Sequence, residues 1–219
     1  AKAAILAGLA FHTTVPLESV HCEGITGVTA AQIESAKQAG YVVKLLAICE
    51  QLESGVSARV HPALVPATHP LASVHGANNA VFVQAEAAGD LMFYGAGAGG
   101  VQTASAVLGD VVSAARRHIA GGVGVGESTR ANLPAVPIGH VITRYQITLE
   151  VDDRPGVLAT VAGILSEGRV SIATVEQTVI EHTPDADDSA SAEGSATGAG
   201  SARLVIGTHK AREQDLSET

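Results

Sequence analysis

The sequence predicts an α/β protein of the α+β kind, in which a mixed sheet with helices is followed by a second, smaller sheet with helices. Runs rich in β-branched residues, such as residues 41–50, alternate with amphipathic stretches, such as residues 103–118. A stretch rich in Gly, Ser and Pro without periodicity, residues 120–140, separates the two parts. We therefore expect one unit over residues 1–119, a linker, and a second unit over residues 141–219.

Composition narrows the possible partners. The 219 residues are 46% hydrophobic but only 3% aromatic, so Ala, Val, Leu and Ile must build the cores. A net charge of −9 argues against nucleic acid or an anionic membrane as the partner. No apolar run approaches the roughly 20 residues that a membrane helix needs. The two cysteines lack metal-ligand spacing and are expected to be reduced thiols of a cytoplasmic protein.

The first unit is expected to begin inside a helix, because no N-cap residue or turn precedes the apolar pattern of residues 1–15. A second helix follows, with Thr29 at its N-cap and Gly40 at its end. Two strands come next, over residues 41–50 and 56–66. Two prolines interrupt the second of these strands, so we expect it to bend or to lie at a sheet edge.

A hairpin is predicted around residues 87–89, and its second strand leads into the glycine-rich loop of residues 95–100. A helix over residues 103–118 follows, and its apolar stripe is expected to be buried. Glycine lets the backbone approach a ligand closely, and a helix N-terminus attracts anions. A nucleotide-like ligand and a plain tight turn both fit this loop.

The second unit is expected to start with a strand over residues 144–151, where apolar and polar residues alternate. A helix follows, with Asp153 as the N-cap, Pro155 in its first turn and Gly168 at its end. Two more strands and the start of a helix are predicted further on. Residues 181–202 are acidic and small, so we expect this segment to be disordered.

The turn between that strand and helix is a candidate ligand site. It consists of Asp152, Arg154, Pro155 and Gly156. A glycine turn at a helix N-terminus suits the carboxylate of a free amino acid, and a capped turn without a ligand is the alternative. The histidines have no pair at metal spacing, so no metal site is assigned.

Several strings resemble known families. AKAAILAGLAFHT, HCEGITGVTAAQI, THPLASVHGANNAVFV and FYGAGAGGVQTASAVLGD resemble the catalytic region of homoserine dehydrogenase, over residues 1 to about 139. DRPGVLATVAGIL and the order of elements in residues 141–216 resemble an ACT domain, a small amino-acid-binding regulatory module with a ferredoxin-like βαββαβ order. The resemblance implies an NAD(P)-dependent enzyme that interconverts L-homoserine and L-aspartate 4-semialdehyde in threonine and methionine biosynthesis. It also implies L-threonine as an effector and a homo-oligomer, dimer or tetramer.

The resemblance also assigns roles to residues. Lys2 matches the lysine that moves a proton, although by position alone it is a solvated terminal residue. The loop residues Gly95, Gly97, Ala98, Gly99 and Gly100 would approach the nicotinamide end of NADP or NAD. The turn from Asp152 to Gly156 would bind the effector, and the helix over residues 103–118 would return to a nucleotide-binding domain.

The sequence departs from the homoserine dehydrogenase pattern in three places. It has no GxGxxG-type nucleotide loop within a βαβ unit, it lacks the carboxylates that precede the lysine, and Gln102 replaces the usual proline. The ACT pattern lacks its final strand. We therefore expect a fragment, truncated at both ends, that is inactive by itself. The alternative is a non-catalytic module for amino-acid binding and dimerisation.

Overall fold

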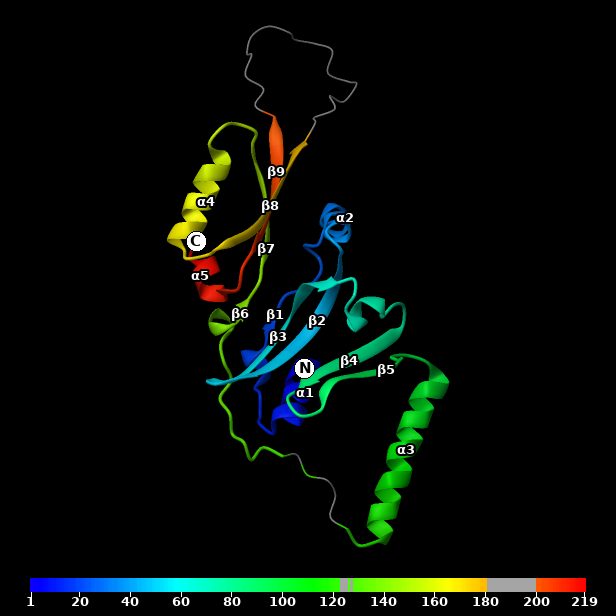
Figure 1. Cartoon of the computed structure of the whole chain (residues 1–219). Helices are drawn as coiled ribbons and strands as arrows, with labels where there is room; N and C mark the ends of the chain where they lie inside the picture. The colour runs from blue at the N-terminus through cyan, green and yellow to red at the C-terminus, as the bar shows by residue number, and fades with distance from the viewer. Residues whose placement is uncertain (123–125, 127, 181–199) are drawn as a thin grey trace. The chain divides into compact units, whose positions relative to one another are not determined.

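The computed structural model describes residues 1–122, 126, 128–180 and 200–219. These residues form two units, Ala1–Ala135 and Val136–Thr219, each built from strands and helices (Figure 1). The α+β class expected from the sequence is confirmed. In the described part of the chain, no helix is long and apolar enough to cross a membrane.

The first unit is built on a three-stranded mixed sheet. Its strand order is β1-β3-β2, with β1 parallel and β2 antiparallel to the central strand. The strands are β1 (His21–Cys22), β2 (Tyr41–Leu52) and β3 (Gly55–Pro66). The expectation that the proline-containing strand lies at an edge is wrong, because β3 is central. It tolerates its prolines because β1 pairs with it only at Arg59 and Val60, before Pro62 is reached.

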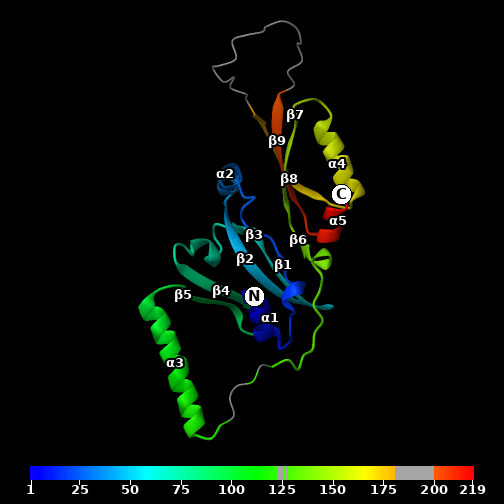
Figure 2. The same cartoon turned by 180° about the vertical axis from the view of Figure 1, so that it is seen from behind.

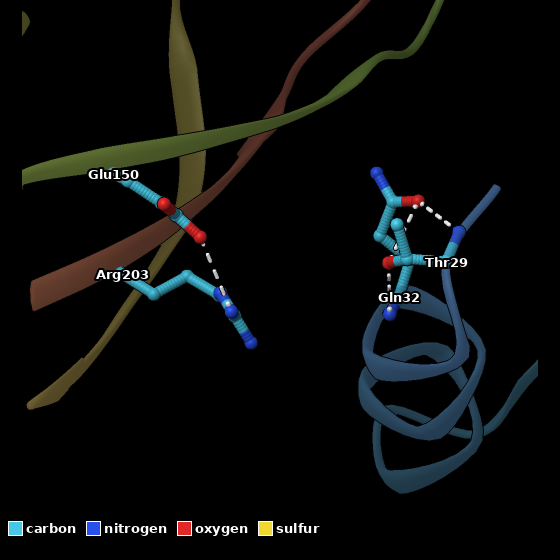
Figure 3. Close-up of polar contacts among 4 residues, drawn as sticks. All are labelled: Thr29, Gln32, Glu150 and Arg203. Carbon is cyan, nitrogen blue, oxygen red and sulfur yellow. Dashed lines mark hydrogen bonds and ion pairs between the residues drawn. The ribbon is translucent and has the colours of Figure 1, made fainter. Parts of the chain in front are cut away.

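Two helices accompany this sheet. Helix α1 (Lys2–Phe11) buries Ala3 and Ala7, and Ala7 belongs to a core cluster with residues of β3. Helix α2 (Ala30–Gln38) starts at a capping box, as expected from Thr29: the Thr29 hydroxyl accepts from the Gln32 N–H, and the Gln32 side chain accepts from the Thr29 N–H (Figure 3). Gly40, at φ 81°, then turns the chain into β2.

The expected hairpin is present as a separate two-stranded sheet of β4 (Asn78–Ala85) and β5 (Gly89–Ala96). A short 3₁₀ helix, η2 (Pro70–Ser73), precedes it. Helix α3 (Gly100–Ile119) follows and starts three residues earlier than expected. The predicted burial of its apolar stripe is wrong for this chain: none of its residues is buried, because no other element of the described residues covers that face.

Part of the expected linker contacts the first unit. Residues 123–125 and 127 lie outside the described residues. Further on, the Thr13 hydroxyl donates to the carbonyl of Leu133 at 2.9 Å, and the Val56 N–H donates to the carbonyl of Pro134 at 2.9 Å. Residues 131–135 are therefore attached to the first unit rather than free.

The second unit has the element order strand, helix, strand, strand, helix, which is the order expected of an ACT domain. Its three strands are antiparallel in the order β7-β9-β8. The core cluster of Leu165, Val170, Ile206 and Ala211 lies between this sheet and its helices. The elements are β7 (Gln146–Asp152), α4 (Val157–Glu167), β8 (Ile172–Ile180), β9 (Ser201–Thr208) and α5 (Glu213–Ser217). The pair β6 (Ile142–Thr143) and β10 (Ala211–Arg212) and the 3₁₀ helix η3 (Ile138–His140) complete the unit.

Alternation along β7 and β9 separates an apolar face from a polar face, as predicted for residues 144–151. On the polar face, Arg203 of β9 lies 3.3 Å from the carboxylate of Glu150 on β7 (Figure 3). Residues 181–199 of the segment predicted to be disordered lie outside the described residues. Its last two residues already belong to β9, and Ala202 is fully buried.

Candidate functional site

A pocket of about 480 Å³ lies in the second unit where β7 ends and α4 begins. All four residues of the predicted turn line it: Asp152, Arg154, Pro155 and Gly156. The structure adds residues from the strands and helix around the turn: Val151, Asp153, Val157, Leu158, Gln177 and Leu204. The pocket lining is therefore mixed: polar side chains from the turn and β8 lie beside the apolar side chains of Val151, Val157, Leu158 and Leu204. Figures 1 and 2 show α4 and the three strands of this unit from two sides.

The backbone conformation of the turn depends on Gly156. This residue has φ 94°, in the left-handed region that favours glycine, and it is the N-cap of α4. Asp153 was expected at the N-cap, and that expectation is wrong, because the chain makes a further turn at residues 154–156 before the helix begins. A Cβ at Gly156 would meet no atom within 4 Å, so the space beside it is open.

The turn presents hydrogen-bond donors. The N–H groups of Asp153 and Arg154 are used internally, since they donate to the carbonyls of Gly200 and Asp152 at 2.6 and 3.0 Å. The first-turn N–H groups of Leu158 and Ala159 have no acceptor among the residues that the structure describes. Together with the positive end of the helix dipole, they favour an anionic group at this place.

Charged side chains stand beside these donors. The Arg154 Nε lies 3.7 Å from the Asp152 carboxylate, and both side chains are 68% exposed. An exposed pair of this kind is weak, so either partner remains available to a ligand. The Asp153 carboxylate accepts a hydrogen bond from the Gln177 side chain at 3.1 Å. The pocket therefore offers both a guanidinium and carboxylates within one turn.

Sequence reasoning missed Gln177. It lies 24 residues beyond Asp153, on β8, and only the register of the strands brings it to the pocket. Leu204, which is 1% exposed, reaches the pocket in the same way from β9. A single polar residue in an alternating strand carries no signal that distinguishes a pocket residue from a solvent-exposed one.

The glycine-rich loop has a structural role at two of its positions. A Cβ at Gly97 would collide with the Asn79 side chain, and the Gly97 N–H donates to the carbonyl of Ala77 at 2.9 Å. Gly99, at φ 136°, has the Gln102 side chain where a Cβ would lie. These two glycines are therefore explained by close contacts within the chain.

The rest of the loop is open. A Cβ at Gly95 or Gly100 would meet no atom within 4 Å, and Ala98 is exposed. A shallow groove of about 680 Å³ continues from this point along the apolar side of α3. Its lining residues are Gly99, Gly100, Thr103, Ala104, Val107 and Leu108. The backbone of the loop is therefore accessible to a ligand at Gly95 and Gly100.

Lys2 is the first residue of α1 and is exposed. Its side chain forms no hydrogen bond or ion pair with any residue of the described ranges. Its ammonium group is thus free to meet a group from outside this part of the chain. Among those same ranges, no cluster of three or more His, Cys, Asp and Glu side chains has a geometry that would hold a metal ion.

The fold and the pocket of the second unit define a regulatory module of the ACT class, and the ACT domain model matches residues 145–219. ACT domains bind amino acids. The homoserine dehydrogenase model matches residues 1–112, which is just over half of the chain. The chain therefore belongs to the homoserine dehydrogenase family.

Individual relatives agree with this assignment. The chain is 52% identical to a homoserine dehydrogenase of Corynebacterium glutamicum and 50% identical to one of Mycobacterium tuberculosis, and each match covers 100% of the chain. The crystal structure of a homoserine dehydrogenase from Thiobacillus denitrificans superposes with a TM-score of 0.83 at 32% identity, over 99% of this chain and 46% of that one. The chain spans about half the length of the curated relatives, 46% and 48% in these two cases.

Proposed function

We propose that the complete protein is an NAD(P)-dependent homoserine dehydrogenase, which interconverts L-homoserine and L-aspartate 4-semialdehyde, and that its ACT domain binds L-threonine as a feedback effector. The observation that supports regulation is the pocket at the turn from Asp152 to Gly156. The observation that supports catalysis is family membership over residues 1–112. By the same reasoning the protein acts in the cytoplasm as a homo-oligomer, a dimer or tetramer.

The pocket suits a zwitterionic α-amino acid. We assign the effector carboxylate to the free N–H groups of Leu158 and Ala159 and to the guanidinium of Arg154, because these donors lie at the N-terminus of α4. The effector ammonium group is assigned to the Asp153 carboxylate, which Gln177 holds in place. The apolar side chains of Val157, Leu158 and Leu204 in the same pocket would then contact a short side chain, as threonine has.

In the proposed reaction, Lys2 moves the proton. Oxidation of homoserine removes a hydride from the carbon that bears the hydroxyl group, and a proton must leave the hydroxyl oxygen at the same time. The nicotinamide cofactor, when bound, supplies the hydride acceptor. The neutral amine of Lys2 accepts the hydroxyl proton, and its ammonium form returns a proton in the reverse direction.

The open backbone at Gly95 and Gly100 fits contact with the nicotinamide end of NADP or NAD, because a side chain at either position would occupy the space next to the loop. Gly97, Ala98 and Gly99 shape the same loop. We place the rest of the cofactor on a nucleotide-binding domain outside residues 1–219. The uncovered apolar side of α3 is the surface that we propose returns to that domain.

Two measurements test the proposal. Calorimetric titration of the 219-residue chain with L-threonine, L-methionine and L-isoleucine tests the pocket, and we expect saturable binding of L-threonine and weaker binding of the other two. Homoserine-dependent reduction of NADP or NAD by the complete protein tests the catalytic part, and the 219-residue chain is the matched control without turnover. A complete protein that binds an amino acid but lacks turnover would favour the alternative of a non-catalytic regulatory and dimerisation module.

A further inference from the structure

Residues 131–135, here called the strap, are fixed to the C-terminal end of α1. The Ala131 N–H donates to the carbonyl of His12 at 3.0 Å, directly after the last helical residue. The Thr13 hydroxyl donates to the carbonyl of Leu133 at 2.9 Å, and Thr13 is only 2% exposed. The two hydrogen bonds run in opposite directions, so each side of the contact donates once. Ordering this irregular segment against the helix end thus gives the buried Thr13 hydroxyl an acceptor.

The strap is also fixed to the start of β3. The Val56 N–H donates to the carbonyl of Pro134 at 2.9 Å, and Val56 forms a parallel bridge with Ala135. This approach needs a glycine, because a Cβ at Gly55 would collide with the Pro134 carbonyl. In addition, the Leu133 side chain packs against the core cluster that includes Ala7 of α1 and Val56 of β3. The strap is therefore anchored by backbone and side chain.

From the contact between α1 and the strap, the chain leads to each of the two proposed sites: through α1 to Lys2, and through the strap to the unit that holds the effector pocket. Helix α1 is ten residues long and begins at Lys2, the proposed proton-transfer residue. The strap ends at Ala135, and the chain enters the second unit with Val136. The segment that joins the effector unit to the catalytic unit is thus attached to the very helix that carries Lys2. A free linker would have no such attachment.

We propose that the strap couples amino-acid binding in the second unit to the position of α1, and so to Lys2. This inference rests on the proposed function. A ligand changes activity only if it favours one of two arrangements of the protein, and a tether fixed to α1 lets the effector-bound arrangement displace that helix. A short helix moves as one body, so a displacement at His12 is passed on to Lys2. A misplacement of about 1 Å at a reacting group is enough to lower turnover about 10²-fold.

The test uses the complete enzyme and three variants. Thr13→Val removes the hydroxyl donor to Leu133 and keeps the side-chain shape. Thr13→Ser keeps the donor, and Thr14→Val changes the exposed neighbour in the same way. For each protein, turnover is measured without effector and at saturating threonine, and threonine binding is measured by calorimetry. Thermal unfolding of each protein shows whether it is folded.

In Thr13→Val we expect uninhibited turnover and threonine binding to stay within about 3-fold of the parent, while the turnover that remains at saturating threonine rises roughly 2- to 10-fold, the range for one lost hydrogen bond. Thr13→Ser and Thr14→Val should be inhibited as the parent is. Equal inhibition of Thr13→Val and Thr14→Val would overturn the coupling role of the strap and leave the effector site intact. If the parent enzyme bound no amino acid, the proposed function of the pocket and the coupling would both be wrong.

Discussion

The side chain of Gln177 donates a hydrogen bond to the Asp153 carboxylate at 3.1 Å, and this contact joins β8 to the turn before α4. Both residues line the pocket of the ACT domain. The hydrogen bond fixes one carboxylate at the pocket while the Asp152 carboxylate remains in a weak, exposed pair with Arg154. Of the two acidic side chains, Asp153 is therefore the preorganised one.

Replacement of Gln177 should weaken amino-acid binding. In Gln177→Ala the Asp153 carboxylate loses the partner that orients it, and we expect the dissociation constant of the effector to rise about 3- to 10-fold. The neighbouring Thr178→Ala is the control, because Thr178 points to the opposite face of the sheet. Calorimetry on the 219-residue chain measures both. Equal affinities in the two variants would remove Gln177 from the site.

Gly156 allows a test that isolates charge. The space beside Gly156 is open, but any side chain is strained at φ 94°. Asp and Asn have nearly the same shape, so the two variants share this strain and differ in charge. Gly156→Asp places a negative charge near the proposed effector carboxylate. Two like charges about 4 Å apart repel by about 1 kcal/mol in water and about 4 kcal/mol at an effective dielectric constant of 20.

In the complete enzyme, Gly156→Asp should therefore raise the threonine concentration for half-inhibition at least several-fold and leave uninhibited turnover nearly unchanged. Gly156→Asn, which has the same shape without the charge, should raise it much less. Turnover measured against threonine concentration decides the matter. Overlapping inhibition curves for Gly156→Asp and the parent would mean that the effector carboxylate does not bind at this turn.

Lys2 is expected to be needed for turnover but not for folding. Lys2→Ala in the complete enzyme should lower turnover by about 10²-fold or more, because general acid–base groups contribute about 10²- to 10⁴-fold. The thermal midpoint should stay unchanged, since the Lys2 side chain is exposed and lacks partners among the described residues. The control is Lys37→Ala, which removes another exposed lysine that lies 3.8 Å from Glu34 on α2. Near-normal turnover in Lys2→Ala would exclude Lys2 from the proton transfer.

The two thiols should react at different rates. Burial raises the pKa of the Cys49 thiol above its usual range, and the nearby Arg59 charge offsets this only in part. The Cys49 Sγ also lies 3.2 Å from the carbonyl of Ala3, whereas Cys22 is exposed. We expect Ellman's reagent at pH 8 to modify Cys22 at least about 10-fold faster than Cys49, because a raised pKa leaves less thiolate.

In the Cys22→Ser variant only the Cys49 thiol can react, and denaturant should abolish the protection of Cys49.

The raised pKa of Cys49 also has a consequence for the stability of the fold. The unfolded chain ionises this thiol at a lower pH than the folded one, so the free energy of unfolding should fall as the pH rises above about 8.5, the usual thiol value. Cys49→Ala should lack this decrease. Two thiols of equal reactivity in the folded chain would contradict the predicted burial effect.

The sequence by itself determined the local elements and the identity of the ACT turn. Thr29 predicted the start of α2 because a threonine hydroxyl suits the N-cap, which is a contact between neighbours, and the structure adds Gln32 as the second half of a capping box. The alternation in residues 144–151 predicted β7, and the strand-to-helix turn with Gly156 predicted where the pocket would form. Such features depend only on residues a few positions apart.

Only the tertiary structure decided which distant residues meet. Gln177 and Leu204 reach the pocket through strand register, and β3 became the central strand because β1 pairs with it in a short stretch that avoids the prolines. The apolar stripe of α3 predicts burial against some partner, but a stripe does not say whether that partner lies within the same 219 residues. Residues 131–135 looked like a linker because they have no periodicity. They are held by hydrogen bonds from Thr13 and Val56 to their backbone carbonyls, and such contacts leave no pattern in the sequence.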